Sequence, residues 1–244
     1  MKGVILAGGA GTRLDPFTRV TNKHLLPVYD RPVIQYAIEQ LVGAGIREIV
    51  LVTDSSQLSA FERVIGDLHS VGAHGLEYVG QDQPGGIAQA LGLAERFAAG
   101  GPVAVLLGDN IFERSIAPIV SRFRAAPRGA LVALARVEDP SQYGIAVMDG
   151  DRISAIVEKP KAHRGDLAVT GLYLYDERVF DIVRSLRPSG RGELEITDVN
   201  NRYLEMGELR HERVTGYWID CGESIAMLFR AGQLVAERGA NRPA

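Results

Sequence analysis

The residues with the clearest chemical potential stand near the N-terminus, in the string ILAGGAGTRLDPFTRVTNKHLLPV. Gly8, Gly9 and Gly11 follow a short apolar run, and glycines let backbone N–H groups turn toward a ligand and let its phosphates come close. Arg13 can grip phosphate oxygens with two parallel hydrogen bonds, and Lys23 can act as a point charge. The string therefore predicts a phosphate-binding loop. A solvent-exposed connection with incidental charges is the alternative.

Two familiar nucleotide-binding loops do not fit this string. The dinucleotide fingerprint G-x-G-x-x-G is matched by Gly9 and Gly11, but Leu14 stands at the position of its third glycine. The P-loop ends in Gly-Lys followed by Ser or Thr, whereas Thr12 and Arg13 follow Gly11 here. A dehydrogenase of the dinucleotide-binding class is therefore disfavoured.

Two carboxylates far apart in the sequence are candidates for a metal site. Asp109 ends the apolar run VAVLLGD, where a buried carboxylate is costly unless it is paired or bound to a cation, and Asp220 stands in WIDCG. If both reach one pocket, their oxygens suit Mg²⁺, which would bridge nucleotide phosphates. A helix N-cap or a turn carboxylate is the alternative role. None of the five histidines stands in a recognisable metal or catalytic motif.

The composition limits the classes of protein. The chain has 244 residues, of which 46% are hydrophobic and 23% charged, as is typical of a globular protein with a substantial core. Its net charge of -3 argues against a nucleic-acid-binding surface. Cys221 is the single cysteine, which excludes an intrachain disulfide, and the apolar runs are too short to span a membrane. No secretory signal is recognisable, so a cytoplasmic location is expected, with neither nucleic acid nor a membrane as partner.

Alternating strand and helix patterns must position the candidate residues. Strands are predicted at residues 3–7, 48–53, 76–81 and 103–107, and helices at 32–42, 58–68, 87–98 and 116–124. This alternation is typical of an α/β protein with a doubly wound, Rossmann-like, mostly parallel sheet and helices on both faces. Ligands of such sheets lie beyond the carboxyl ends of the strands, which draws attention to residues 8–26, 81–86 and 108–111.

After about residue 128 the pattern changes to an added antiparallel layer. Strands are predicted at residues 130–137, 144–148, 152–158 and 168–175, with a DGD hairpin turn between the second and the third. Helices are predicted from about residue 194 and from about residue 223. No linker or repeat separates the two parts, so a single domain over residues 1–244 is expected.

The N-terminal string closely resembles the signature of the sugar-1-phosphate nucleotidylyltransferases, G-G-x-G-T-R-L followed by a spaced K-x-L-L-P. The resemblance continues through QDQPGGIAQAL, LGDNIF, YGIAVMD, EKP, VTGLYLYD, RGELEITDVN and WIDCG, to about residue 230. Within the family, the combination is most similar to members that transfer a thymidylyl group. It implies that residues 1–128 bind the nucleotide and that residues 129–230 form the sugar-phosphate-binding layer.

The resemblance implies that dTTP and glucose 1-phosphate react to give dTDP-glucose and pyrophosphate, an entry step to deoxysugars such as dTDP-rhamnose. It places Mg²⁺ at Asp109 and Asp220. The implied catalytic residues are Arg13, Lys23, Asp109 and Lys159. The implied nucleotide contacts are Leu6, Gly8, Gly9, Gly11, Thr12, Arg13, Lys23, Gln81, Gly86 and Asp109. The implied sugar-phosphate contacts are Asn110, Tyr143, Gly144, Glu158, Lys159 and Val169.

The chemistry of these side chains suggests their individual roles. Arg13 would stabilise charge on the leaving pyrophosphate, and Lys23 would hold the α-phosphate region. In isolation Glu158 and Lys159 would be an ordinary surface ion pair or strand edge. The resemblance implies instead that Glu158 accepts hydrogen bonds from sugar hydroxyls and that Lys159 binds the sugar phosphate. Because neighbouring residues on a strand face opposite sides, a bend must let both reach the substrate. Gln81 can offer a donor and an acceptor to a base edge, which favours thymine or uracil over a purine.

Several alternatives stay open. Uracil differs from thymine by one methyl group, so a uridylyltransferase or another pyrimidine-dependent relative is the nearest alternative, and an inactive sugar-nucleotide-binding regulator is a minor one. His24 and Gly85 stand where many relatives have Gln and Asp. The chain ends soon after its last predicted helix, so we expect a short form that lacks the C-terminal extension of longer members and in which their regulatory nucleotide site is absent or altered. A homo-oligomer, smaller than theirs, is expected.

Overall fold

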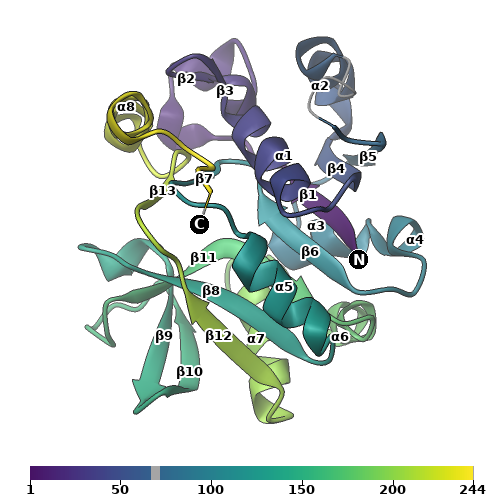
Figure 1. Ribbon diagram of the computed structural model, residues 1–244, viewed down its shortest axis with the longest axis vertical. Coiled ribbons are helices and arrows are strands. Elements are labelled where there is room, and N and C mark those ends of the chain that lie inside the picture. Colours follow the sequence, from purple (N-terminus) through teal and green to yellow (C-terminus); the bar gives the residue numbers. More distant parts are fainter. Residues whose placement is uncertain (67–71, 244) are drawn as a thin grey trace.

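The computed structural model describes residues 1–66 and 72–243, and within them a nine-stranded mixed sheet forms the centre of the molecule (Figure 1). Four neighbouring strands are parallel, in the spatial order β6 (Val103–Leu107), β1 (Lys2–Leu6), β4 (Glu48–Asp54) and β5 (Gly75–Gln81). In β1, β4 and β6 the short apolar runs are buried from end to end apart from the terminal residues, because helices cover both faces.

The antiparallel strands extend this sheet through β11 (Leu167–Tyr175), every residue of which is buried. One edge of β11 pairs first with β9 and then with β6, while β8 lies along its other edge. The remaining strands of this part are β8 (Ala130–Arg136), β9 (Gly144–Asp149), β10 (Arg152–Glu158) and β12 (Leu209–Arg213). The sheet therefore branches at β11, with the parallel strands on one branch and the β9–β10 hairpin on the other (Figure 1).

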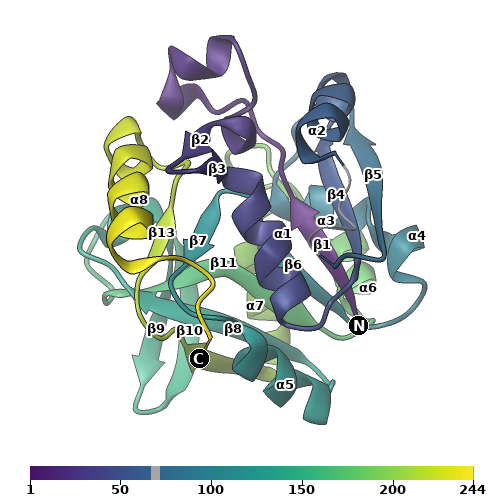
Figure 2. The same cartoon turned by 45° about the horizontal axis from the view of Figure 1, so that its top comes forward.

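Helices cover the two faces of the sheet, as the α/β pattern predicts, so the expected fold class is confirmed (Figure 2). The helices on one face are α1 (Val33–Gly43), α2 (Leu58–Ile65) and α5 (Ala117–Ala125). The helices on the other face are α3 (Ile87–Gly92), α4 (Glu95–Ala98), α6 (Val179–Ser185) and α7 (Ile196–Glu205). No helix among the described residues is long and apolar enough to span a bilayer.

A smaller unit joins the C-terminal part of the chain to the N-terminal part. The strands β7 (Asn110–Phe112) and β13 (Trp218–Asp220) form an antiparallel pair, and α8 (Ile225–Arg238) packs beside them against the hairpin of β2 (Pro27–Val28) and β3 (Arg31–Pro32). The backbone N–H of Asn241 then donates to Phe112, which fastens the chain end to β7. This unit brings Asp220 next to Asn110, the residue after Asp109.

Three predicted helices have different bounds in the structure. The helix expected at residues 87–98 is two helices, because the backbone N–H groups of Leu93 and Ala94 form tighter i→i+3 bonds between them. The helix expected from about residue 194 begins at Ile196, because the backbone of Leu194 is bonded to the segment after β5 instead. The last helix begins at Ile225, after Ser224 caps it. Leu68, expected in the second helix, lies outside the described residues.

Some elements were not predicted. The strand β12 has the sequence LRHER, which lacks the alternation of apolar residues that indicates a strand. It forms because its backbone completes the free edge of β8 in a parallel ladder. The strand β7 is a three-residue element hidden in the loop that follows β6.

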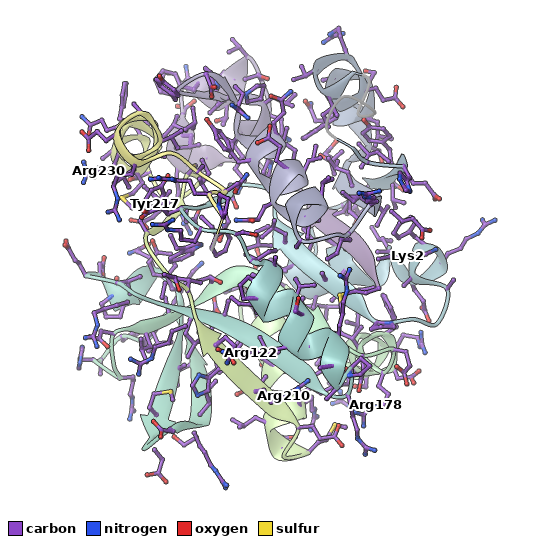
Figure 3. The ribbon with its side chains drawn as sticks, viewed as in Figure 1. Lys2, Arg122, Arg178, Arg210, Tyr217 and Arg230 are labelled. Carbon is purple, nitrogen blue, oxygen red and sulfur yellow. The ribbon has the colours of Figure 1, made fainter. Side chains whose placement is uncertain are left out.

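A buried carboxylate fixes the end of β11 to the helix α7. Asp176 is only 2% exposed and accepts hydrogen bonds from the Tyr203 hydroxyl at 2.7 Å and the Gly129 N–H at 2.7 Å. Arg178, on the lower right of Figure 3, donates to it from Nε at 2.9 Å. Burial alone would raise the pKa of Asp176, but the hydrogen bonds from Arg178, Tyr203 and Gly129 outweigh it and hold the pKa below its usual value.

We expect Asp176→Asn to lower the free energy of unfolding by about 1–3 kcal/mol at pH 7, because hydrogen bonds to an ionised acceptor are lost. A carboxylate with a lowered folded-state pKa stabilises the fold above its unfolded-state pKa, near 4, and this contribution is lost as the pH falls through the folded value. Urea unfolding should therefore show the difference between variant and wild type shrinking from pH 7 toward pH 3.

The exposed carboxylate of Asp181 offers a matched control, since its side chain is 73% exposed. Asp181→Asn should change the free energy of unfolding little at either pH. An Asp176→Asn deficit of the same size at pH 7 and pH 3 would contradict the ionic role of Asp176.

Candidate active site

Two adjoining cavities open at the carboxyl ends of the strands. The first cavity lies at the ends of β1 and β6, where the strand order reverses direction and where ligands of such sheets bind. It contains the candidate residues Leu6, Gly8, Gly9, Lys23, Gln81, Gly86 and Asp109. The second cavity contains the candidate residues Arg13, Asn110, Tyr143, Gly144, Glu158, Lys159, Val169 and Asp220. Gly11 and Thr12 are not among the lining residues of either cavity.

The glycine-rich string folds as a series of short 3-10 helices. It does not lead directly into an α-helix whose N-terminus could bind a phosphate. The short helices cover Thr12–Leu14, Phe17–Arg19 and Lys23–Leu25. The Thr18 hydroxyl donates to the carbonyl of Gly11 at 3.0 Å, which closes the loop on itself. As a result Arg13 reaches the rim of the second cavity while Lys23 points into the first.

Lys23 and Asp109 both line the first cavity and form a largely buried ion pair, with Lys23 Nζ 2.5 Å from Asp109 Oδ2. Asp220 lies beside this pair. A Cβ atom on Gly222 would be 2.4 Å from Asp109 Oδ2, 3.0 Å from Lys23 Nζ and 3.2 Å from Asp220 Oδ1, so the three groups converge on one point and leave no room for a larger residue there. The two carboxylates predicted from separate motifs are therefore neighbours.

The charges in this cluster are unbalanced, since two carboxylates face one ammonium group. For Asp109, burial opposes ionisation, but the Lys23 charge outweighs it and holds the pKa well below its usual range. For Asp220, burial and the charge of Asp109 together raise the pKa to about 7. For Lys23, burial lowers the pKa, and the two carboxylates more than compensate. The cluster therefore favours binding of a further cation.

Asp109 is held in place by Asn110 and by the β7–β13 pair. The Asn110 amide donates to Asp109 Oδ1 at 3.0 Å, and its carbonyl oxygen accepts from Gly171 N at 2.8 Å and from Trp218 Nε1 at 2.6 Å. The backbone N–H of Cys221 donates to the carbonyl of Asp109. Asn110 lines the second cavity as expected, but its amide oxygen already has two donors, so its evident contribution is to orient Asp109.

His24 does not supply acid–base chemistry at neutral pH. Its ring is 1% exposed and its Nδ1 lies 2.8 Å from Asn22 Oδ1. Burial and the neighbouring Lys23 charge lower the pKa of His24 to about 3, so the ring is neutral. This residue lines the first cavity as an uncharged side chain.

The second cavity is built around Glu158 and Lys159 at the end of β10. Lys159 has a backbone φ of 42°, and its N–H donates to the carbonyl of Tyr143, so the chain bends there and both side chains line the cavity. Thr197 Oγ1 donates to Glu158 Oε2 at 2.6 Å and Arg191 Nη2 to Oε1 at 3.3 Å. The expected bend is therefore present.

Several residues of the second cavity were not predicted individually, although their motifs were noticed. They are Tyr173, Arg191, Glu193, Glu195, Thr197 and Trp218. Arg191 and Glu195 stand in the charged run RGELEITDV just before α7, and a charged run that leads into a helix could have drawn attention to them. Burial lowers the pKa of Lys159, and the charges of Arg191 and Arg13 lower it further against the opposing charges of Glu158 and Glu193. The basic side chains Arg13, Lys159 and Arg191 all line this cavity, so it offers several donors to a phosphate.

The donor set fits Mg²⁺. Among the described residues no group of three or more His, Cys, Asp and Glu side chains could enclose a metal ion, so a protein-only cage is absent there. Mg²⁺ is commonly bound by one or two carboxylates together with substrate phosphates and water. Asp109 and Asp220, crowded in a buried site with too little positive charge, match that donor set.

Known proteins resemble the chain along almost its whole length. The family model described as nucleotidyl transferase matches residues 2–237. A glucose-1-phosphate thymidylyltransferase of Actinoplanes sp. is 46% identical over 95% of this chain and 77% of its own length. One from Neisseria gonorrhoeae is 44% identical over 91% of this chain and 78% of its own length.

Solved structures of related proteins have the same fold as this chain. A Bacillus anthracis protein described as a glucose-1-phosphate thymidylyltransferase, in complex with sucrose, superimposes with a TM-score of 0.91 at 45% identity, covering 96% of this chain and 94% of its own. A UDP-glucose pyrophosphorylase in complex with UDP-glucose superimposes with a TM-score of 0.85 at 26% identity, covering 97% and 98%. On the strength of the matched motifs, the fold and these similarities, the chain belongs to the nucleotidyl transferase family.

Proposed function

We propose that this protein transfers a thymidylyl group from dTTP to glucose 1-phosphate, giving dTDP-glucose and pyrophosphate with the assistance of Mg²⁺. The observation that carries the proposal is the cluster of Lys23, Asp109 and Asp220 at the junction of two cavities. The names of the relatives at 42–46% identity support the choice of substrates.

The reaction requires charge neutralisation and alignment more than activation of a nucleophile. A sugar-phosphate oxygen attacks the α-phosphorus in line, and pyrophosphate leaves as the P–O bond to it breaks. The attacking phosphate is ionised at neutral pH, so no general base is needed. Two polyanions must nevertheless meet, and the buried cations of the site offset their repulsion.

The first cavity would hold the nucleoside and the second the sugar phosphate. Lys23, fixed by Asp109, would contact the α-phosphate, and Arg13 on the glycine loop would stabilise charge on the leaving pyrophosphate. Lys159 would bind the sugar phosphate, while Glu158 would accept hydrogen bonds from the sugar hydroxyls. Asp109 and Asp220 would hold Mg²⁺, which when bound neutralises phosphate charge.

A homo-oligomer is part of the proposal. Tyr29 in the β2–β3 turn is 65% exposed, Phe229 on α8 is 67% exposed, and α8 packs against β2. Large apolar side chains exposed on neighbouring elements suit contact with a second subunit.

A uridylyltransferase is the second candidate, favoured by the similarity to UDP-glucose pyrophosphorylase at 26% identity. Initial rates with dTTP, UTP and CTP against glucose 1-phosphate separate the two functions. We expect kcat/KM to be highest for dTTP and lower for UTP by about tenfold or more, because UTP lacks the base methyl group, which contributes about 1–3 kcal/mol in a fitted pocket, and also carries an added 2′-hydroxyl. A higher kcat/KM with UTP would overturn the nucleotide assignment.

Substitution of the two carboxylates should separate activity from stability. Asp220→Asn should lower turnover at least about a hundredfold, since a ligand of Mg²⁺ is lost. Measured without divalent cations, its free energy of unfolding should stay the same or rise, because a carboxylate that repels Asp109 is removed.

Asp109→Asn is the contrasting variant. It should lower turnover as much but also destabilise the fold by about 1–3 kcal/mol, because Lys23 loses its hydrogen-bonded carboxylate and keeps only the charge of Asp220 beside it. Denaturant unfolding and rates of pyrophosphate release measure both effects. Full activity of Asp220→Asn would contradict the metal assignment.

Lys159→Met tests the sugar-phosphate site. Losing one charged hydrogen bond to the phosphate should raise the KM for glucose 1-phosphate by about tenfold or more and leave the KM for dTTP within about threefold. Lys161→Met, two residues further along and exposed, is the matched control and should change neither KM. Equal increases in both KM values would count against this division of the cavities.

A further inference from the structure

The side-chain amide of Gln81 is paired with a second glutamine that the proposed reaction does not use. Gln81 is the last residue of β5, is 6% exposed and lines the first cavity. Its Nε2 donates to Oε1 of Gln89, on the neighbouring helix α3, at 2.5 Å. Gln89 itself is not among the residues that line the cavity, so it acts on a ligand there only through Gln81.

This hydrogen bond decides which end of the Gln81 amide is available to a ligand. With Nε2 turned toward Gln89, the carbonyl oxygen Oε1 lies against the cavity wall at Gly8, where an added Cβ atom would be only 2.6 Å away. Gly8 and Gln81 both line the first cavity. The group presented on this side is therefore a hydrogen-bond acceptor.

The side chain of Gln89 packs over Gly85, and the backbone on both sides of Gly85 is fixed. A Cβ atom on Gly85 would lie 3.0 Å from both Cγ and Cδ of Gln89, so a larger residue at position 85 would press on that side chain. The carbonyl of Gly85 accepts from the N–H of Leu194, and the N–H of Ala88 donates to the carbonyl of Leu194. These bonds fix the loop and the start of α3 that carry Gln89.

The direction of the amide matters for the choice among pyrimidines. Thymine and uracil carry an N3–H donor, whereas N3 of cytosine is an acceptor. A freely rotating glutamine amide could turn its oxygen to the first two bases or its NH₂ group to the third. An amide fixed with its oxygen toward the base would leave two acceptors facing each other in the cytosine complex.

We propose that Gln89 is a positioning residue for base selection, holding Gln81 so that its carbonyl oxygen accepts from N3–H of thymine or uracil and disfavours cytosine. The inference rests on the proposed function, because it places a pyrimidine base in the first cavity. It adds a residue that selects against cytosine and leaves the choice between thymine and uracil to other contacts.

Two substitutions with opposite hydrogen-bonding properties test the proposal. Gln89→Leu removes the partner of Gln81 Nε2 and frees the amide to rotate. The ratio of kcat/KM for dTTP to that for dCTP should fall by about tenfold, mainly through a higher KM for dTTP, while kcat at saturating dTTP stays within about threefold. A purely structural role would instead lower kcat with every nucleotide.

Gln89→Glu is the discriminating variant. A carboxylate can only accept, so it should keep Nε2 of Gln81 in place and preserve the wild-type ratio. If the pair has the opposite direction, with Gln89 donating, this variant would turn the Gln81 amide around and the preference for dTTP would collapse. That result would overturn the proposal, as would an unchanged ratio in Gln89→Leu.

Binding measurements keep this test separate from the proposed reaction. Dissociation constants for dTTP and dCTP, measured by calorimetry without sugar phosphate, should show the same pattern across the variants. Absence of turnover by the wild-type protein with dTTP and glucose 1-phosphate would defeat the proposed function, whereas the dTTP-to-dCTP ratio of dissociation constants would still decide the role of Gln89. Gln233→Leu, an equivalent change at an exposed position of α8, should leave that ratio unchanged.

Discussion

Lys23 and Asp109 form an ion pair at the carboxyl edge of the sheet, and the carboxylate of Asp220 lies beside it. Burial makes this arrangement costly in the absence of ligand, as the raised pKa of Asp220 indicates. The cluster by itself therefore carries more negative than positive charge. Under the proposed function, a divalent cation and the phosphates that arrive with it would relieve this imbalance.

The fold keeps this strained cluster in position through hydrogen bonds that belong to the architecture. Asn110 bonds at once to the Asp109 carboxylate, to the Gly171 backbone in β11 and to the indole of Trp218 in β13. Each contact comes from a different part of the chain, so the carboxylate is fixed by three elements. A preorganised group of this kind needs little rearrangement when substrate binds.

The branching of the sheet at β11 creates the two adjoining cavities. The parallel branch ends in the loops that form the first cavity, and the β9–β10 hairpin forms part of the second. The ion pair lines the first cavity and the neighbouring Asp220 lines the second, so the cluster connects the two, and under the proposed function each cavity would take one anionic substrate. In each cavity a neighbouring side chain orients a group that faces a ligand. In the first cavity Gln89 orients the amide of Gln81, and in the second Thr197 and Arg191 hold the carboxylate of Glu158.

The parallel strands could be predicted from the sequence, and so could the candidate side chains of Arg13, Lys23 and Asp109 beyond them, because short apolar runs and the motifs after them are local signals. It also required a bend at Lys159, which the structure contains. Three relations became visible only in the folded chain: Asp220 lies against Asp109, β12 completes the edge of β8, and Gln89 reaches Gln81. These relations join residues whose contact depends on strand pairing and on burial, which no local pattern of residue types encodes.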